Sequence, residues 1–248
     1  MAGEYVRWLA RDVKPAEKKE LTKEEKRRNW WDYHKWHVVI AVVCLVLTVD
    51  LVFDMVRNAR NEPDYTIAYV GITALPVDLI EAVEEAVAEH GEDLNGNGKV
   101  QVELMEYQLY DENAAENPAQ QEENAERAYN ASVLLTLNIE TVDSMIYILE
   151  DPELFGSTYP ILCHTDGTLP EEGSDAPMYY LWKDCPVLAG LELGTFQLPG
   201  IYGPIEGDCQ SAMSGLAVAR RGLWDDEPGE KINGAIRLWE ILTEGAAK

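Results

Sequence analysis

Basic residues are scarce in most of this chain, and the scarcity is uneven. Residues 61–248 contain eight Lys and Arg against thirty-six Asp and Glu, a net charge of −28, whereas residues 1–36 carry a net charge of +3. Binding of nucleic-acid phosphates needs clustered cations, which excludes the acidic part as a nucleic-acid-binding domain. The contrast in charge indicates that the two parts face different surroundings.

The motifs of common catalytic sites are also missing. The Gly-rich stretches 190–194 and 198–207 lack the Lys and the helix of a phosphate-binding loop, and no Ser lies in a G-x-S-x-G nucleophile elbow. Beyond residue 37 the only histidines are His90 and His164. We therefore expect a non-enzymatic protein.

Cysteines are few, and their spacing argues against a metal centre. Cys44 lies in an apolar run, and Cys163, Cys185 and Cys209 follow without any C-x-x-C pair. Such spacing disfavours a zinc site. Two alternatives stay open for the last three cysteines: buried free thiols, or one Cys163–Cys185 disulfide.

What the sequence does contain is one long apolar run. Residues 37–56, HVVIAVVCLVLTVDLVFDMV, match the ~20 residues with which a helix crosses a bilayer core. Ten Lys and Arg precede the run, and a cluster of Trp and Tyr between residues 30 and 36 lies where an interfacial aromatic belt is expected. The positive-inside rule places the N-terminus in the cytoplasm and the C-terminal part outside.

We interpret this run as a retained signal anchor in the cell membrane. The preceding 36 residues are long for a signal peptide, and no A-x-A cleavage site follows. Thr22 and Glu25 have the spacing of a capping box, which predicts a helix start there. The expected organisation is a cytoplasmic tail (1–36), a single transmembrane helix (37–56), a link (57–63) and an extracellular α/β domain (64–245).

Two acids, Asp50 and Asp54, lie near the outer end of the span, one helical turn apart. Intramembrane acids are candidates for functional residues, and these two could pair with a cationic residue of another span. The alternative is that both reach the outer headgroups, because they lie close to the end of the span.

The extracellular part begins with a strand–helix–strand pattern. Residues 64–71 read as a β-strand, residues 76–91 as a helix with an apolar stripe, and residues 99–110 as a second strand. The alternation of apolar residues slips at Met105, which predicts a bulge or bend. This order is typical of a βαβ unit, so we expect a mixed, mainly parallel sheet with flanking helices.

Further helices and strands are predicted after the second strand. An acidic stretch leads into a helix ending near Val142, and residues 144–151 read as a strand buried on both faces. Residues 151–214 are rich in Gly and Pro and predict loops and short strands. Residues 214–224 read as a late strand, and residues 231–245 as a closing helix.

Several of these stretches carry a resemblance to a protein family. The chain resembles uncharacterised single-span proteins of anaerobic Gram-positive bacteria. The resemblance is carried by YHKWH at the start of the predicted span and then, in order, by DYTIAYVG, YILEDPELF, DGTLP, LWKDCPVLAGLELG and ARRGLWDD. The element order is also similar to a cut-down, single lobe of type II periplasmic binding proteins, with the late strand returning to the first sheet. The resemblance implies topology and fold, and no activity.

Residues 93–98, DLNGNG, begin like a calcium-binding EF-hand loop. Asp93, Asn95 and Asn97 occupy the first three ligand positions, and Gly98 occupies the sixth. Position twelve, which needs a bidentate Glu, is Leu104. A helix-to-strand turn is therefore the favoured interpretation, and a weak calcium site is the alternative.

Aromatic residues gather in the Gly/Pro-rich segment and around it. Core packing is the simpler explanation for them, but loops at strand ends are also where α/β sheets bind ligands. The residues selected as a ligand-binding surface are Tyr180, Trp182 and Trp224.

Two functions follow from the sequence. The first is a membrane-tethered, non-enzymatic domain that binds a partner protein or assists an envelope complex. The alternative is a sensor module that binds a small ligand or calcium. No cofactor is expected, apart from the calcium alternative.

Overall fold

The computed structural model describes residues 22–109, 118–171, 176–200, 203–224 and 228–247. The chain divides into two compact units, residues 1–57 and 58–248, which are considered separately.

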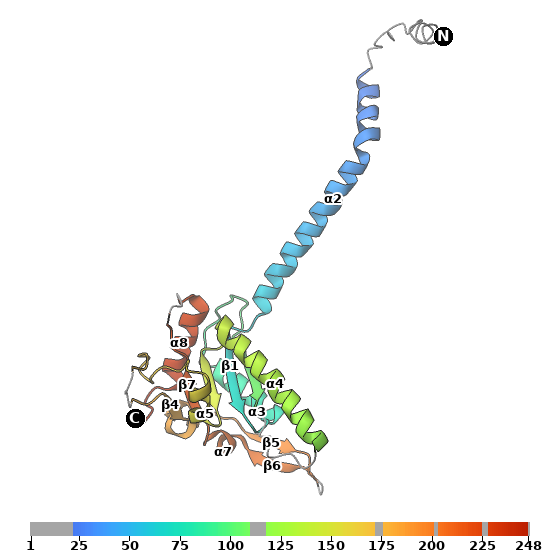
Figure 1. The fold of residues 1–248 in the computed structure, drawn as a ribbon. Helices are drawn as coiled ribbons and strands as arrows, with labels where there is room; N and C mark the ends of the chain where they lie inside the picture. Colours follow the sequence, from blue (N-terminus) through green and yellow to red (C-terminus); the bar gives the residue numbers. More distant parts are fainter. Residues whose placement is uncertain (1–21, 110–117, 172–175, 201–202, 225–227, 248) are drawn as a thin grey trace, which may run out of the picture. The chain divides into compact units, whose positions relative to one another are not determined.

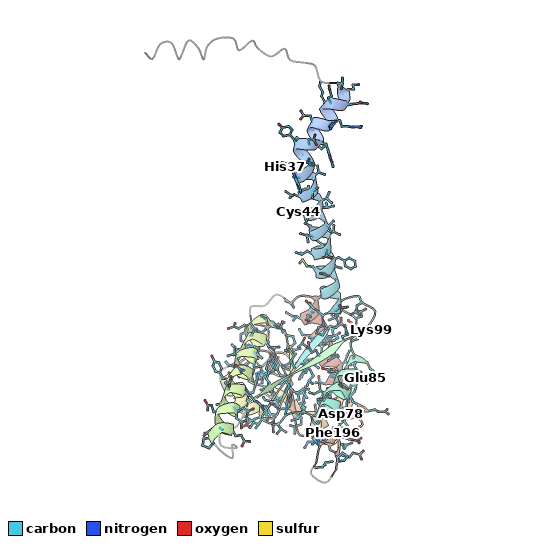
Figure 2. All side chains as sticks on the ribbon, turned by 90° about the vertical axis from the view of Figure 1, so that its right-hand side faces the viewer. His37, Cys44, Asp78, Glu85, Lys99 and Phe196 are labelled. Carbon is cyan, nitrogen blue, oxygen red and sulfur yellow. The ribbon has the colours of Figure 1, made fainter. Side chains whose placement is uncertain are left out.

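One long helix, α2 (Lys23–Asn61), dominates the first unit (Figures 1 and 2). Its start is the predicted capping box: the Thr22 backbone N–H donates to Glu25 Oε2 at 2.9 Å, and the Glu25 N–H donates to Thr22 Oγ1 at 3.4 Å. The helix is long and apolar enough to cross a membrane, and its most apolar stretch is not buried inside the protein. It continues to Asn61, so most of the expected link 57–63 is helical.

The second unit is built around a mixed five-stranded sheet with the strand order β2-β1-β3-β7-β4 (Figure 1). Strand β1 is parallel to β2 and β3, whereas β7 is antiparallel to both β3 and β4. The late strand β7 thus returns to the sheet between β3 and β4. The strands are β1 (Tyr65–Gly71), β2 (Val102–Gln108), β3 (Ile146–Leu149), β4 (Tyr179–Leu181) and β7 (Ala217–Arg220).

Helices cover both faces of the sheet. On one face, α3 (Val77–Ala88) and α8 (Glu230–Leu242) contribute Val83 and Leu238 to a core that includes Ile67 of β1. On the other face, α4 (Pro118–Thr141) and α5 (Pro152–Thr158) contribute Leu135 and Phe155 to a second core. Because β1 is covered on both faces, all seven of its residues are buried. The prediction of an α/β fold with a mixed sheet and flanking helices is confirmed. The expectation that the sheet is mainly parallel is wrong, because β7 joins it antiparallel to both of its neighbours.

The Gly/Pro-rich segment folds into short elements, and three of them are α-helices where loops and short strands were predicted. Two strands form a separate hairpin, and β5 packs against α3, where the Gln197 N–H donates to Asp78 Oδ2 at 3.2 Å. Figure 2 labels Asp78 and Phe196 at this contact. The elements are α5, β4, η2 (Trp182–Asp184), α6 (Pro186–Ala189), β5 (Thr195–Leu198), β6 (Ile205–Asp208) and α7 (Cys209–Met213).

The predicted bulge at Met105 is wrong. The whole of β2 is described, and it pairs with β1 residue by residue from Val102 to Gln108. The alternation of apolar residues changes because β2 is an edge strand whose two faces are covered by different helices at different points along it. Leu104 is buried in the core on the α3 side, whereas Tyr107 is buried in the core on the α4 side.

Candidate functional site

A cavity of about 790 Å³ lies at the carboxyl ends of the parallel strands β1 and β3. Gly71 ends β1 and Glu150 follows β3, and both line the cavity. Helix α5 supplies Phe155 and Thr158, and β4 supplies Leu181. Open α/β sheets bind ligands at this edge, because their loops converge there.

Glu150 shapes one wall of the cavity by holding the loop between β1 and α3. Its Oε2 accepts hydrogen bonds from the backbone N–H groups of Ile72 at 2.6 Å and Thr73 at 3.0 Å. Its Oε1 accepts from Thr73 Oγ1 at 3.0 Å. A side chain at Gly71 would clash with the Glu150 carboxylate and the Tyr69 hydroxyl, so this close approach requires glycine.

The same loop is fixed from two further sides. The Tyr69 hydroxyl donates to the carbonyl oxygen of Thr73 at 2.7 Å, and Glu106 Oε1 accepts from the N–H of Leu75 at 2.8 Å. Burial raises the pKa of Tyr69, and the charges of Glu150 and Glu106 raise it further. The hydroxyl therefore stays protonated and keeps its role as a donor.

Asp151 and Pro152 start helix α5 at the cavity. Asp151 is the N-cap, and its Oδ1 accepts from the N–H of Leu154 at 2.9 Å, while Pro152 occupies the first turn. This start places Phe155 and Tyr159 on the cavity wall, with ring centroids 5.3 Å apart. The wall thus combines aromatic rings with carboxylates.

The described lining of the cavity contains Glu150, Asp151 and Glu153 but no His, Cys, Ser, Lys or Arg. Such a lining offers apolar surface and negative charge to a bound molecule. This site was not among the predicted ones. Its signal in the sequence is the stretch EDPELF directly after a buried strand, which places an acidic pair and an N-cap at the edge where parallel strands end.

The residues selected from the sequence as a ligand surface lie elsewhere, and none of them lines this cavity. Trp182 is a core residue, 1% exposed, and its Nε1–H donates to Gln210 Oε1 at 3.0 Å. Tyr180 packs against the same core and stacks on Trp239, with ring centroids 6.3 Å apart. Trp224 is 44% exposed. Core packing, the simpler explanation, holds for Tyr180 and Trp182.

The loop 93–98 has the geometry of a turn. Both carboxylate oxygens of Asp93 accept backbone N–H groups of the loop itself, from Gly96 and Gly98, each at 2.7 Å. The side-chain oxygens of Asn95 and Asn97 accept the N–H two residues further on. Gly96 and Gly98 have positive φ, as the favoured turn interpretation requires.

Calcium ligation by this loop stays a prediction. The twelfth position, Leu104, is a buried core residue rather than a carboxylate. In the part of the chain that the structure describes, no group of three His, Cys, Asp or Glu side chains is placed to hold a metal ion. A calcium ion would have to be held by Asp93 together with amide oxygens.

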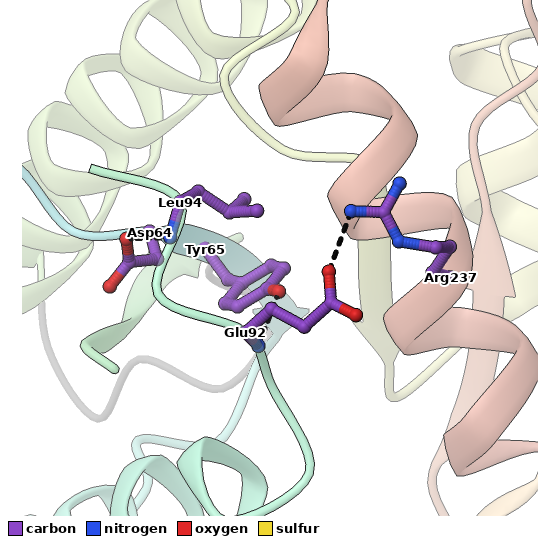
Figure 3. A network of polar contacts seen from close by, with 5 residues as sticks. All are labelled: Asp64, Tyr65, Glu92, Leu94 and Arg237. Atoms are coloured by element: carbon purple, nitrogen blue, oxygen red, sulfur yellow. Dashed lines mark hydrogen bonds and ion pairs between the residues drawn. The ribbon is translucent and has the colours of Figure 1, made fainter. Parts of the chain in front are cut away.

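A buried carboxylate, Asp64, ties this loop to the start of β1 (Figure 3). Its Oδ1 accepts from the N–H groups of Leu94 and Asn95 at 2.8 and 3.0 Å, and its Oδ2 accepts from the N–H of Gln101 at 2.8 Å. Next to it, Arg237 of α8 donates to Glu92 Oε2 at 2.7 Å (Figure 3).

The Tyr65 hydroxyl also belongs to this network and accepts the N–H of Glu92 at 2.8 Å (Figure 3). Burial raises the pKa of Tyr65, and the charge of Glu92 contributes in the same direction. These contacts anchor the loop, so we assign them to the architecture of the unit.

Asp50 and Asp54 both lie on α2 with exposed side chains. The structure describes this unit by itself, so pairing with another span stays a prediction.

The cysteines are all free, and the Cys163–Cys185 disulfide is not formed. Cys163, Cys185 and Cys209 are buried. Burial, with a contribution from the charge of Asp184, raises the pKa of the Cys185 thiol to about 11. This thiol stays protonated near neutral pH, which makes it a poor nucleophile.

Comparison of the chain with protein-family models, with curated proteins and with solved structures finds no match.

Proposed function

We propose that this chain is a membrane-anchored, non-enzymatic α/β domain that binds a small ligand in the cavity at the carboxyl ends of β1 and β3. The observation that carries the proposal is the cavity itself. Its volume of about 790 Å³ lies within the range of small-molecule sites, and its walls combine apolar surface with a few oriented polar groups.

The anchor in this proposal is helix α2. The ten Lys and Arg before the apolar run support a cytoplasmic N-terminus, and therefore an extracytoplasmic binding domain. In this arrangement the domain samples ligands outside the cell and remains at the membrane. The binding-protein resemblance is compatible with such a role and belongs to the same proposal.

The cavity can be closed selectively. Gly215 lies on its wall, and a Cβ at this position meets open space. Gly215→Leu should therefore narrow the cavity, because a side chain can begin at this position without a clash. A thermal-shift screen of the full chain in detergent, with amino acids, sugars, amines and aromatic acids, should find compounds that stabilise the wild type and leave Gly215→Leu unaffected. If every compound shifts both proteins equally, the proposal is overturned.

A partner protein is the second candidate, and one observation favours it. Helix α4 presents an apolar stripe to solvent, although its buried residue Leu135 faces the sheet. The stripe consists of Tyr129, Val133, Leu134 and Leu137, all at least half exposed. Exposed apolar patches of this kind mark protein contacts.

Site-specific photo-cross-linking from position 133 in cells tests the partner. A discrete adduct that Leu137→Glu removes would support it, and the absence of any adduct would exclude α4 as the contact. Co-purification with Asp50→Leu and Asp54→Leu separately tests whether the same partner is held through the span.

A further inference from the structure

The charges around the cavity have one sign. Glu150, Asp151 and Glu153 line it within four residues of the chain, and none of the three forms an ion pair with any residue that the structure describes. The whole chain reinforces this local charge, with a formal net charge of −25. A cavity with such walls attracts cations and repels anions.

Two of these carboxylates are already oriented. Glu150 is fixed by three hydrogen bonds from Ile72 and Thr73, and Asp151 by its cap on the N–H of Leu154. Each carboxylate oxygen can accept more than one hydrogen bond, so both groups retain acceptor sites for a ligand. Because their side chains are held in place, little conformational entropy is lost when a donor binds.

The remaining walls suit the rest of a ligand. Tyr159 and Tyr179 place aromatic rings on the cavity, and aromatic faces attract ammonium and guanidinium groups. Val70, Leu181 and Ala217 supply aliphatic surface, which accepts an alkyl or aryl stem.

We infer that the ligand of this cavity is a small organic cation: an ammonium, amidinium or guanidinium group on an apolar or aromatic stem. This inference rests on the proposed ligand-binding function, and it names the chemical class that the cavity selects. Glu150, Asp151 and Glu153 bind the cationic group, and the aromatic and aliphatic walls enclose the stem.

Three compounds of nearly the same shape test the charge directly. Benzamidine is a cation, benzamide is neutral and benzoate is an anion. Titration calorimetry of the full chain in a non-ionic detergent should give a dissociation constant for benzamidine at least about tenfold lower than that for benzamide, as for one charge-assisted hydrogen bond, and no binding of benzoate.

The matched variants are Glu153→Gln and Glu240→Gln. Both side chains are exposed, both substitutions remove one negative charge, and Glu240 on α8 does not line the cavity. Glu153→Gln should weaken benzamidine about three- to tenfold and leave benzamide unchanged, whereas Glu240→Gln should change neither. Gly215→Leu should abolish binding of both compounds.

The outcomes separate this inference from the proposed function. If benzamide binds as tightly as benzamidine and Gly215→Leu abolishes both, the cavity binds ligands but the cationic class is overturned. The cationic class is also overturned if, in the wider thermal-shift screen, only neutral or anionic compounds stabilise the wild type and not Gly215→Leu. If no compound distinguishes the wild type from Gly215→Leu, both proposals are overturned.

Discussion

The indole of Trp182 and the side-chain amide of Gln210 form a hydrogen bond that joins two parts of the Gly/Pro-rich segment. Trp182 Nε1–H donates to Gln210 Oε1 at 3.0 Å, and Gln210 Nε2 donates in turn to the carbonyl oxygens of Leu188 at 2.8 Å and Leu191 at 2.7 Å. One amide thus satisfies a buried indole and two backbone carbonyls. It explains why an irregular segment can hold a tryptophan that is almost fully buried.

We expect Gln210→Leu to destabilise the second unit by about 2 kcal/mol or more, because the indole N–H and two carbonyl groups lose their partner. Urea unfolding of the full chain in detergent, followed by tryptophan fluorescence, measures the change. Gln197→Ala is the control, because that side chain is exposed and should cost less than about 0.5 kcal/mol. Equal midpoints for the two variants would contradict a structural role of Gln210.

Asp64→Asn should loosen the loop 93–101. An asparagine offers one acceptor oxygen in place of two, so the amides of Leu94, Asn95 and Gln101 cannot all keep their bonds. We expect a loss of about 1–3 kcal/mol in unfolding free energy. Hydrogen exchange should accelerate at these amides first, and unchanged exchange there would refute the anchoring role.

The turn interpretation of residues 93–98 makes a calcium experiment decisive. Because the twelfth position is Leu104 and two of the three early ligands are neutral amides, we expect about 5 mM calcium to leave the thermal midpoint unchanged. Asp93→Ala should lower that midpoint with or without calcium. A calcium-dependent rise that Asp93→Asn abolishes would show a metal site instead.

Alkaline pH should unfold the second unit through its buried tyrosines. Burial raises the pKa of Tyr65, Tyr69, Tyr107 and Tyr147 above the usual value of ~10 that the unfolded chain has. Between that value and the folded pKa, the folded state holds more protons than the unfolded state, so stability falls as pH rises.

Urea midpoints measured between about pH 8 and pH 11 test this dependence. Because burial also raises the pKa of the Cys185 thiol, the midpoint should begin to decline between about pH 8 and pH 9 and should fall more steeply near about pH 10. Tyr107→Phe should make the steeper part of the decline shallower. A midpoint that stays level to pH 11 would contradict the assignment.

Protease protection tests the orientation of the anchor. In right-side-out vesicles of the expression host, added protease should reach the C-terminal unit and leave a tag at the N-terminus intact. In inverted vesicles the pattern should reverse. Replacing Arg27, Arg28 and Lys35 by Gln should yield a mixed population, because the positive charge before the span sets its direction. The opposite protection pattern in the wild type would place the cavity in the cytoplasm.

Much of the architecture was accessible from local sequence patterns. The capping box at Thr22, the helix after Pro76 and a strand within residues 144–151 each depend on neighbours in sequence. Each prediction is confirmed, and the strand is observed at residues 146–149. The three short helices in residues 151–214 were missed because α5, α6 and α7 have only four to seven residues, too few for a helical period to show.

The site was harder to foresee than the fold. Trp182 was selected as a surface residue because its partner Gln210 lies 28 positions away and gives no local signal. The cavity joins Gly71, Glu150 and Gly215, which come together only when β7 inserts beside β3. A sequence pattern within one segment cannot show that these three residues lie together in the fold. The phase change at Met105 was misread for the same reason, because the covering helix α4 comes later in the chain.

The position of β7 has a consequence for how the protein is made. Among the strands that the structure describes, β4 pairs only with β7 in the sheet, and β7 begins at residue 217. The five-stranded sheet cannot be completed, and the wall that contains Ala217 cannot form, until residues 217–220 have been synthesised. Until then β3 keeps an open edge, a state in which chains are prone to misassociate. A chain terminated before residue 217 is therefore expected to expose the edge of β3 and to be a substrate for quality-control proteases.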